Sequence, residues 1–319
     1  MAVFTEVSIA DASTLIAQLD IGRLTRLEPC SGGIENTNYF ADTTAGRYVL
    51  TVFERLTFEQ LPYYLQLMQH LARRQIPVPE PHATRSGTIL HCVHGKSVAV
   101  VDRLEGQHNL APDAAHCASV GAMLARMHRA GLDFALHQPN LRGLTWWQET
   151  APLVVAHLAP AQAELLEAEL AFQVHLAASA AHTALPRGAI HADLFRDNVM
   201  FDGERLTGLF DFYFAGVDAF AFDIAVCLND WCPDTERGHL DESRATAMVA
   251  AYDAVRPLTG GELRLLPATM RAAALRFWLS RLWDLHAPRR AKVLEAREPA
   301  QIERILRACI DTPWHYVRT

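Results

Sequence analysis

The pattern of apolar residues changes once along this 319-residue chain, at segment 104–107, and this change constrains the fold more than any other feature. Before the segment, short runs rich in β-branched and aromatic residues, such as Tyr48–Phe53, indicate strands separated by turns. After it, Ala-rich and Leu-rich stretches with helical spacing dominate. We therefore predict an α+β protein of two lobes: an antiparallel sheet lobe with one main helix at 1–103, a hinge at 104–107 and a larger, mostly helical lobe at 108–319.

The individual elements follow from local signals. Two capping-box patterns, Ser8–Asp11 and Thr57–Gln60, predict a short helix to about Leu19 and a longer helix that ends near Arg74. Strands are expected at 23–29, 38–41, 47–53, 88–93, 97–103, 199–201 and 206–210. Helices of the second lobe are expected at 112–129, 145–158, 161–184, 222–231, 241–255, 262–286 and 300–310.

Charge and composition exclude several kinds of partner. The net charge is −7 and no long basic run occurs, so nucleic acid is not expected to bind. The first residues lack the basic and apolar regions of a signal peptide, and the longest uncharged stretch, 170–186, contains several polar residues, so no membrane span is expected. The six cysteines form no C-x-x-C pair and are expected to be reduced, which indicates a cytoplasmic protein. The oligomeric state stays open.

Lysine is scarce, and this limits the schemes by which the chain can handle phosphate. Of 29 basic residues only Lys96 and Lys292 are lysines, and Gly95-Lys96-Ser97 is the one string that resembles part of a P-loop. Leu90 stands where a P-loop needs its first glycine, and a strand rather than a helix is expected after Ser97. A P-loop nucleotidase is therefore excluded.

The segment His191–Asn198 carries the strongest chemical signal. It fits the H-x-D-L-x-x-x-N pattern of kinase catalytic loops, and an apolar strand that ends in Asp211 follows it. Phosphoryl transfer needs a carboxylate that orients the attacking hydroxyl and accepts its proton, and oxygen ligands that hold Mg²⁺ against the phosphates. We therefore predict Asp193 as the base and Asn198 and Asp211 as Mg²⁺ ligands. His191 is expected to hold the backbone of the loop through a buried hydrogen bond.

On these residues the chain resembles the protein-kinase-like small-molecule kinases, the superfamily of aminoglycoside and choline kinases. Within it the chain looks most like the kinase-like group of homoserine kinases. The strings that carry this resemblance are 31–39, 48–54, 76–81, 191–198, 211–214, 228–232 and 276–281.

The resemblance implies a bilobal protein-kinase-like fold, ATP and Mg²⁺ as cofactors, and L-homoserine as the small-molecule substrate. The implied reaction phosphorylates the side-chain hydroxyl to give O-phospho-L-homoserine for threonine biosynthesis. By the same resemblance Asp223 braces the catalytic loop. The residues implied to contact ATP are Ser31, Gly32, Gly33 and Asn36 in a phosphate-covering loop, Val49 and Thr51 on a strand, and Leu104, Glu105 and Gly106 at the adenine edge.

One position departs from the protein-kinase pattern. Thr51 stands where protein kinases place the lysine that binds the α- and β-phosphates. Backbone N–H groups of the loop, together with Mg²⁺, can neutralise these phosphates instead. Arg47 and Arg55 are further candidates, although a surface role is expected more often for such arginines.

A zwitterionic acceptor requires a cation for its carboxylate and a carboxylate or carbonyl groups for its ammonium. The candidates in the helical lobe are Asp230, Arg276, Arg281 and Asp284. Arg281 and Asp284 are three residues apart on one predicted helix face, so a simple intrahelical ion pair is an equal alternative for them.

Three other hypotheses about the function stay open. The same fold can act on another hydroxyl acceptor, such as an aminoglycoside, a choline-like amine or an amino alcohol. Thr51 raises the possibility of a pseudokinase that regulates a partner. A metal-dependent hydrolase that uses His191, Asp193 and Asp211 requires further His ligands nearby.

Overall fold

The computed structural model describes residues 5–30, 36–234, 238–286 and 298–318. The chain divides into two compact units, the first formed by 1–106 with 208–210 and the second by 107–207 with 211–319. Among the helices that the structure describes, none is both long enough and apolar enough to cross a membrane.

The first unit is built on a five-stranded antiparallel sheet with the strand order β1-β2-β3-β5-β4. Its strands are β1 (Leu24–Pro29), β2 (Thr37–Thr43), β3 (Arg47–Phe53), β4 (His91–Val93) and β5 (Lys96–Asp102). This confirms the predicted antiparallel sheet in the N-terminal part of an α+β protein.

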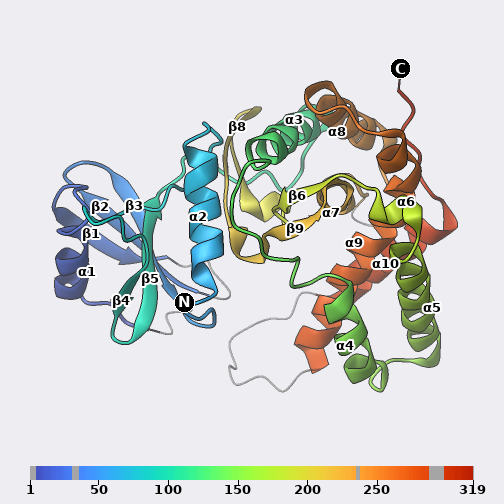
Figure 1. The fold of residues 1–319 in the computed structure, drawn as a ribbon, viewed down its shortest axis with the longest axis horizontal. Helices are drawn as coiled ribbons and strands as arrows, with labels where there is room; N and C mark the ends of the chain where they lie inside the picture. The colour runs from blue at the N-terminus through green and yellow to red at the C-terminus, as the bar shows by residue number, and fades with distance from the viewer. Residues whose placement is uncertain (1–4, 31–35, 235–237, 287–297, 319) are drawn as a thin grey trace. The chain divides into compact units, whose positions relative to one another are not determined.

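Two helices lie on opposite sides of this sheet, as Figure 1 shows. The first is α1 (Ile9–Ile16), whose residues Leu15 and Ile16 pack in one buried cluster with Leu50 of β3 and Val98 of β5. The second is α2 (Leu61–Ala72). Because side chains alternate along a strand, residues of β3 next to Leu50 face the α2 side.

The second unit is mostly helical, as predicted. Its helices are α3 (Ala114–Ala130), α4 (Leu144–Val155), α5 (Pro160–Ala177), α6 (Ala180–Thr183), α7 (Phe220–Trp231), α8 (Glu242–Val255), α9 (Gly260–His286) and α10 (Pro299–Asp311). The expected single helix at 161–184 is wrong, because Ser179 interrupts it: its side chain accepts a hydrogen bond from the N–H of His182 and starts α6.

Short strands frame the predicted catalytic loop. They are β6 (Arg187–Ile190), which pairs with β9 (Gly216–Ala219), and β7 (Val199–Asp202), which pairs with β8 (Arg205–Leu209). The β7–β8 hairpin was predicted, whereas β6 and β9 were not. Four residues that include a glycine give too little pattern to identify such a strand.

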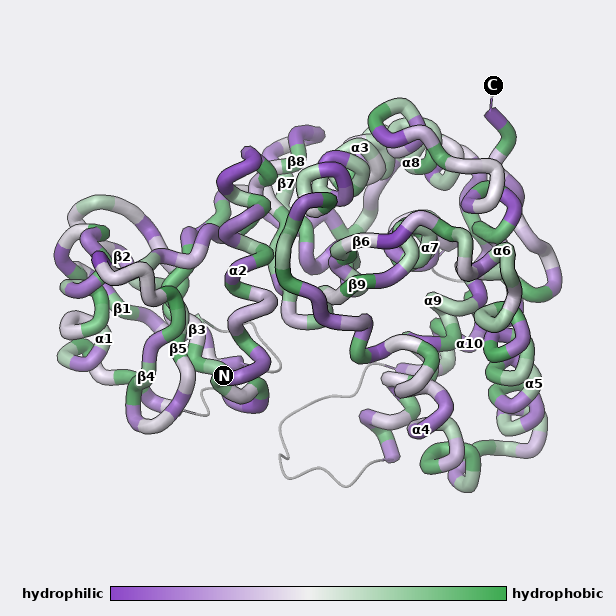
Figure 2. The backbone as a smooth tube through the Cα atoms, viewed as in Figure 1, coloured by the Kyte–Doolittle hydropathy of each residue, from purple (hydrophilic) through white to green (hydrophobic). Residues whose placement is uncertain are grey.

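Helix α7 lies inside the second unit. Every residue of α7 except Asp230 is buried, and Figure 2 shows it mainly in the hydrophobic colour. A helix that is buried on all sides and mainly apolar belongs to an interior. Beside it, α3 and α8 approach each other closely at Gly121, where a Cβ atom would lie 2.0 Å from the carbonyl oxygen of Met248. Only glycine permits this approach.

Candidate active site

The predicted catalytic loop runs from His191, after β6, to Asn198, which ends a 3-10 turn (Arg196–Asn198) before β7. Ala192 has φ 63° and Asp211, which follows β8, has φ 65°. Residues other than glycine rarely adopt this left-handed conformation, which costs about 1 kcal/mol or more for each residue. Such strain persists only where the surroundings impose it, so residues that contact this loop must hold it in this conformation.

The carboxylate of Asp193 lies between an amide and a guanidinium. Asn198 Nδ2 donates to the carbonyl oxygen of Asp193 at 2.8 Å and to its Oδ2 at 3.2 Å. On the other oxygen, Arg276 Nη1 lies 3.8 Å from Asp193 Oδ1. The Asp193 side chain is 17% exposed, so solvent reaches it while these two neighbours fix its orientation.

The carboxylate of Asp223 holds the strained turn through hydrogen bonds to its backbone. Its Oδ2 accepts a hydrogen bond from the N–H of His191 and its Oδ1 accepts one from the N–H of Ala192, both at 2.7 Å. His128 Nε2 lies 3.0 Å from the same Oδ2, and all four residues are buried. Burial alone raises the pKa of Asp223, but the hydrogen bonds from His128 and the loop outweigh it and hold that pKa below its ordinary value. His191 Nδ1 in turn accepts from the N–H of Asp193 at 3.3 Å.

The last turn of α7 holds the other end of the loop. Asp230 Oδ2 accepts hydrogen bonds from the backbone N–H of Arg196 at 2.8 Å and from its Nε at 3.1 Å. Trp231 Nε1 donates to the carbonyl oxygen of Leu194 at 2.9 Å, and the Cys227 thiol lies 3.6 Å from the same oxygen. The sequence pattern did not indicate this contact of Trp231. The adjacent Asp and Trp were visible, but nothing in their spacing indicates which carbonyl the indole meets.

The four predicted acceptor-binding residues lie in different surroundings. Arg276, which is 3% exposed, adjoins Asp193, whereas Asp230 binds Arg196. Arg281 Nη1 donates to the carbonyl oxygen of Glu298 at 3.0 Å, and Asp284 lies one turn further along α9. Of the four, the structure brings Arg276 to the predicted base.

The predicted nucleotide-binding residues belong to the first unit. Ser31, Gly32 and Gly33 lie outside the described residues, and Asn36 immediately precedes β2. Val49 and Thr51 are on β3, and their side chains face away from α1.

The segment predicted as a hinge, 104–107, makes two contacts within the first unit. A Cβ atom at Gly208 would lie 2.4 Å from the side chain of Leu104, so glycine is required beneath that residue. Glu105 forms an ion pair with Arg47, one of the candidate phosphate-binding cations, and Gly106 adopts φ 115°.

The structure shows what surrounds Thr51, which stands at the position of the strand-three lysine, and where Lys96 lies. Thr51 is 4% exposed and its hydroxyl donates to Asn38 Oδ1 at 2.8 Å. Lys96, the one lysine in the described part of the chain, lies on β5 on the same side as Val98, which is the α1 side. Its Nζ lies 3.1 Å from Glu54 Oε2. Lys96 therefore does not replace a lysine at Thr51.

The donor atoms of Asn198 and Asp211 suit Mg²⁺. Because Asn198 Nδ2 donates to Asp193, Oδ1 is the atom of this amide that a metal ion can use, and Asp211 offers a carboxylate. Mg²⁺ prefers such oxygen ligands and retains several waters, so it needs few protein groups. Within the ranges that the structure describes, no group of three or more His, Cys, Asp or Glu side chains could hold a metal ion. The hypothesis of a metal-dependent hydrolase requires further His ligands near His191, and the described residues do not supply them.

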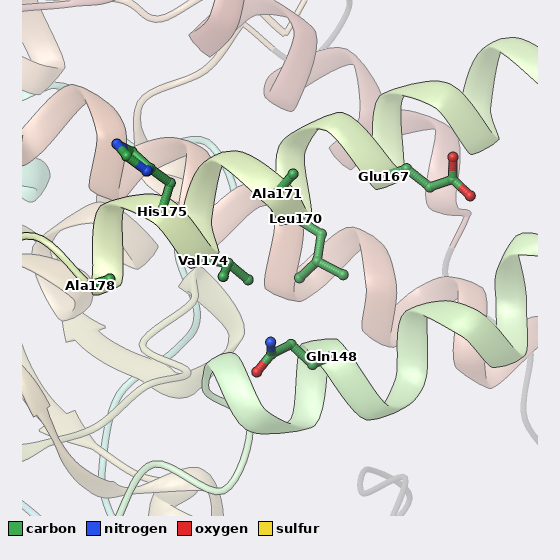
Figure 3. A pocket seen from close by; sticks show the side chains of 7 residues that line it. All are labelled: Gln148, Glu167, Leu170, Ala171, Val174, His175 and Ala178. Atoms are coloured by element: carbon green, nitrogen blue, oxygen red, sulfur yellow. The ribbon is translucent and has the colours of Figure 1, made fainter.

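A surface groove of about 710 Å³ lies apart from these residues, between α4 and α5 (Figure 3). Its lining consists of Gln148, Glu167, Leu170, Ala171, Val174, His175 and Ala178. It contains none of the predicted site residues, and its polar side chains do not converge on one point in Figure 3.

A sheet unit, a helical unit and a braced loop with Asp193 and Asn198 form the arrangement that the sequence analysis predicted for a phosphotransferase. Residues 26–258 match the family described as "Phosphotransferase enzyme family", and the chain belongs to this family. More narrowly, it belongs with the homoserine kinases. It is 59% identical to the homoserine kinase of Polaromonas naphthalenivorans (strain CJ2), over 98% of this chain and 99% of that protein. It is 53% identical to the homoserine kinase of Janthinobacterium sp. (strain Marseille), over 98% and 97% of the two chains.

Solved structures share the fold at low sequence identity. An amicoumacin kinase in complex with AMP-PNP, Ca²⁺ and Ami superposes with a TM-score of 0.70 at 17% identity, covering 94% of this chain and 92% of that one. A choline/ethanolamine kinase family protein from Mesorhizobium loti gives a TM-score of 0.62 at 18% identity, covering 96% of each chain. These findings confirm the predicted protein-kinase-like fold and the predicted family.

Proposed function

We propose that this protein transfers the γ-phosphoryl group of ATP to the side-chain hydroxyl of L-homoserine, which gives O-phospho-L-homoserine for threonine biosynthesis. The observation that carries the proposal is 59% identity to a homoserine kinase over nearly the whole of both chains. The retained Asp193, Asn198 and Asp211 support catalysis over a regulatory pseudokinase.

In this reaction the homoserine hydroxyl oxygen forms a bond to the γ-phosphorus, the bond to the β–γ bridging oxygen breaks, and ADP leaves. Asp193 orients the hydroxyl and accepts its proton. Asn198 holds the Asp193 carboxylate in place through its amide N–H. Asn198 and Asp211 would also hold Mg²⁺, which would neutralise charge on the phosphates. The transferred phosphoryl group itself needs positioning rather than covalent help.

The proposed roles of the two units follow the predicted bounds. Residues 1–103 cover ATP, 104–107 form the hinge whose backbone meets adenine, and 108–319 supply the catalytic loop and the acceptor site. In the first of these, Ser31, Gly32, Gly33 and Asn36 cover the phosphates, while Val49 and Thr51 line the nucleotide site. Since Thr51 bonds to Asn38, we assign phosphate neutralisation to backbone N–H groups and Mg²⁺. We also propose a cytoplasmic location, because all six cysteines are free thiols.

A panel of acceptors tests the function. Purified protein with Mg·ATP should release ADP much faster with L-homoserine than with choline, an aminoglycoside or simple amino alcohols. Background release with every acceptor would refute an enzymatic role. Preference for another hydroxyl compound would refute the assignment of homoserine and keep the mechanism.

The variant Asp193→Asn tests the base. It should lower kcat by about 10²- to 10⁴-fold while ATP still binds, because proton acceptance is lost. The matched control is Asp202→Asn, which changes an exposed aspartate in the neighbouring hairpin that pairs with Arg205. Equal kcat values for the two variants would remove Asp193 from its role.

A further inference from the structure

The side chains beside Asp193 indicate how the carboxylate of the acceptor is recognised, an inference that rests on the proposed function. Arg276 projects from α9, is 3% exposed, and its Nη1 lies 3.8 Å from Asp193 Oδ1. A buried guanidinium is costly unless anions or aromatic rings compensate it. The chain has therefore fixed a positive charge next to the atom that meets the acceptor hydroxyl.

Aromatic rings set the position of this guanidinium. Its central carbon lies 3.8 Å from the ring centroid of Phe277 and 4.9 Å from that of Phe214. Phe277 packs in turn on Phe195 of the catalytic loop, with ring centroids 4.3 Å apart. An aromatic ring contributes no hydrogen-bond acceptor in its plane, so the N–H groups at the edge of a guanidinium remain suited to the two oxygens of a carboxylate.

A second arginine approaches the same aromatic ring. The central carbon of the Arg142 guanidinium lies 5.8 Å from the ring centroid of Phe214 and 4.4 Å from that of Trp146. Phe214 comes just after Asp211 in the chain. The guanidinium groups of Arg142 and Arg276 thus both lie within 6 Å of the Phe214 ring centroid, at 5.8 Å and 4.9 Å.

We infer that Arg276, assisted by Arg142, binds the α-carboxylate of the acceptor and thereby selects an amino acid over an amino alcohol. The dimensions agree with this assignment. In homoserine the hydroxyl and carboxylate oxygens are about 5 Å apart, given bonds of about 1.5 Å. An acceptor that places its hydroxyl at Asp193 can therefore reach Arg276, whose Nη1 lies 3.8 Å from Asp193.

Two acceptors that differ only in the carboxylate test this inference. L-Homoserine without its carboxylate is 3-aminopropan-1-ol. In Arg276→Lys and Arg276→Gln, kcat/KM should fall about 100-fold with L-homoserine and change little with 3-aminopropan-1-ol, because a buried charge-assisted contact is lost for the first alone. Arg142→Gln should reduce the homoserine value about tenfold. An equal loss with both acceptors would mean that Arg276 only orients Asp193 or faces the phosphoryl group, and would overturn the inference.

A binding measurement covers the case in which 3-aminopropan-1-ol reacts too slowly to assay. L-2-Aminobutyrate retains the carboxylate and lacks the hydroxyl, so its inhibition constant against homoserine does not depend on proton acceptance by Asp193. This constant should rise about 100-fold in Arg276→Lys. An unchanged constant would overturn the inference.

Arg271 provides a matched control on the same helix. It also stacks on an aromatic ring, that of Phe172 at 3.7 Å, but it pairs with the buried Glu169. Arg271→Lys should leave the discrimination between the two acceptors unchanged, and Mg·ATP affinity should be retained in every variant. If wild-type protein fails to phosphorylate L-homoserine, the proposed function fails. If wild-type protein succeeds and Arg276→Lys keeps full discrimination, only the present inference fails.

Discussion

Replacement of Trp231 by phenylalanine isolates one hydrogen bond to the catalytic loop. Trp231 is fully buried, and its indole N–H donates to the carbonyl oxygen of Leu194, the residue after Asp193, at 2.9 Å. Phenylalanine keeps an aromatic ring in the core but removes this donor. The Cys227 thiol, 3.6 Å from the same oxygen, is then the remaining donor among the residues that the structure describes, and a thiol is a weak donor.

The expected loss has two parts. The smaller ring leaves a cavity that costs about 1 kcal/mol, by the relation between cavity volume and stability. A buried carbonyl that loses its partner costs about 1–3 kcal/mol more. We therefore expect Trp231→Phe to lower the free energy of unfolding by about 2–4 kcal/mol. Because Leu194 adjoins Asp193, kcat should also fall, by about tenfold for each 1.4 kcal/mol of lost positioning.

Trp278 is the matched control. It is also fully buried, but its indole N–H meets no hydrogen-bond acceptor within the residues that the structure describes. Trp278→Phe leaves the same cavity, which destabilises the protein, and removes a buried unsatisfied donor, which stabilises it. These two changes in the free energy of unfolding should nearly cancel. Urea unfolding and steady-state kinetics at saturating ATP measure the two variants side by side. Equal losses of stability and of kcat would refute the argument that the hydrogen bond to Leu194 matters.

Three further predictions address other parts of the molecule. Asp211→Ala should abolish Mg²⁺-dependent ATP binding in calorimetry, and an unchanged affinity for Mg·ATP would contradict the metal role. Gly121→Ala should destabilise the protein by about 3 kcal/mol, because its Cβ would lie 2.0 Å from the Met248 carbonyl oxygen; Gly260→Ala, where a Cβ meets nothing within 4 Å, is the control in the same urea titration. Burial lowers the pKa of His128 below its ordinary 6.5, so the unfolded state takes up a proton first and stability should fall as pH drops below about 6.5, by up to about 1.4 kcal/mol per pH unit. His128→Gln should remove this contribution, and identical pH slopes for variant and wild type would argue against it.

The local pattern of apolar residues in the sequence predicted much of the fold. The strands at Arg47–Phe53 and the long helix Gly260–His286 appear where alternation and helical spacing predicted them. The helix break at Ser179 was missed because an apolar, uncharged stretch continues through it, and the capping hydrogen bond to His182 is decided by the fold around it.

The sequence by itself determined the class of chemistry. His191, Asp193 and Asn198 lie within one short loop, so their spacing fixes which groups can act together without knowledge of distant packing. The threonine at position 51, where protein kinases have a lysine, was equally visible, because the string 48–54 carries the resemblance to the kinase family. The full-length resemblance to homoserine kinases rests on the same order of residues.

Only the tertiary structure decided which distant side chains meet this loop. Arg276 comes from α9 and Trp231 from α7, and helical periodicity shows which face a residue occupies but not which helix covers that face. The same limit applied to Lys96, whose side of the sheet depends on the position of α1. Contacts between segments far apart in the chain depend on how whole elements pack, and no spacing within a single element encodes them.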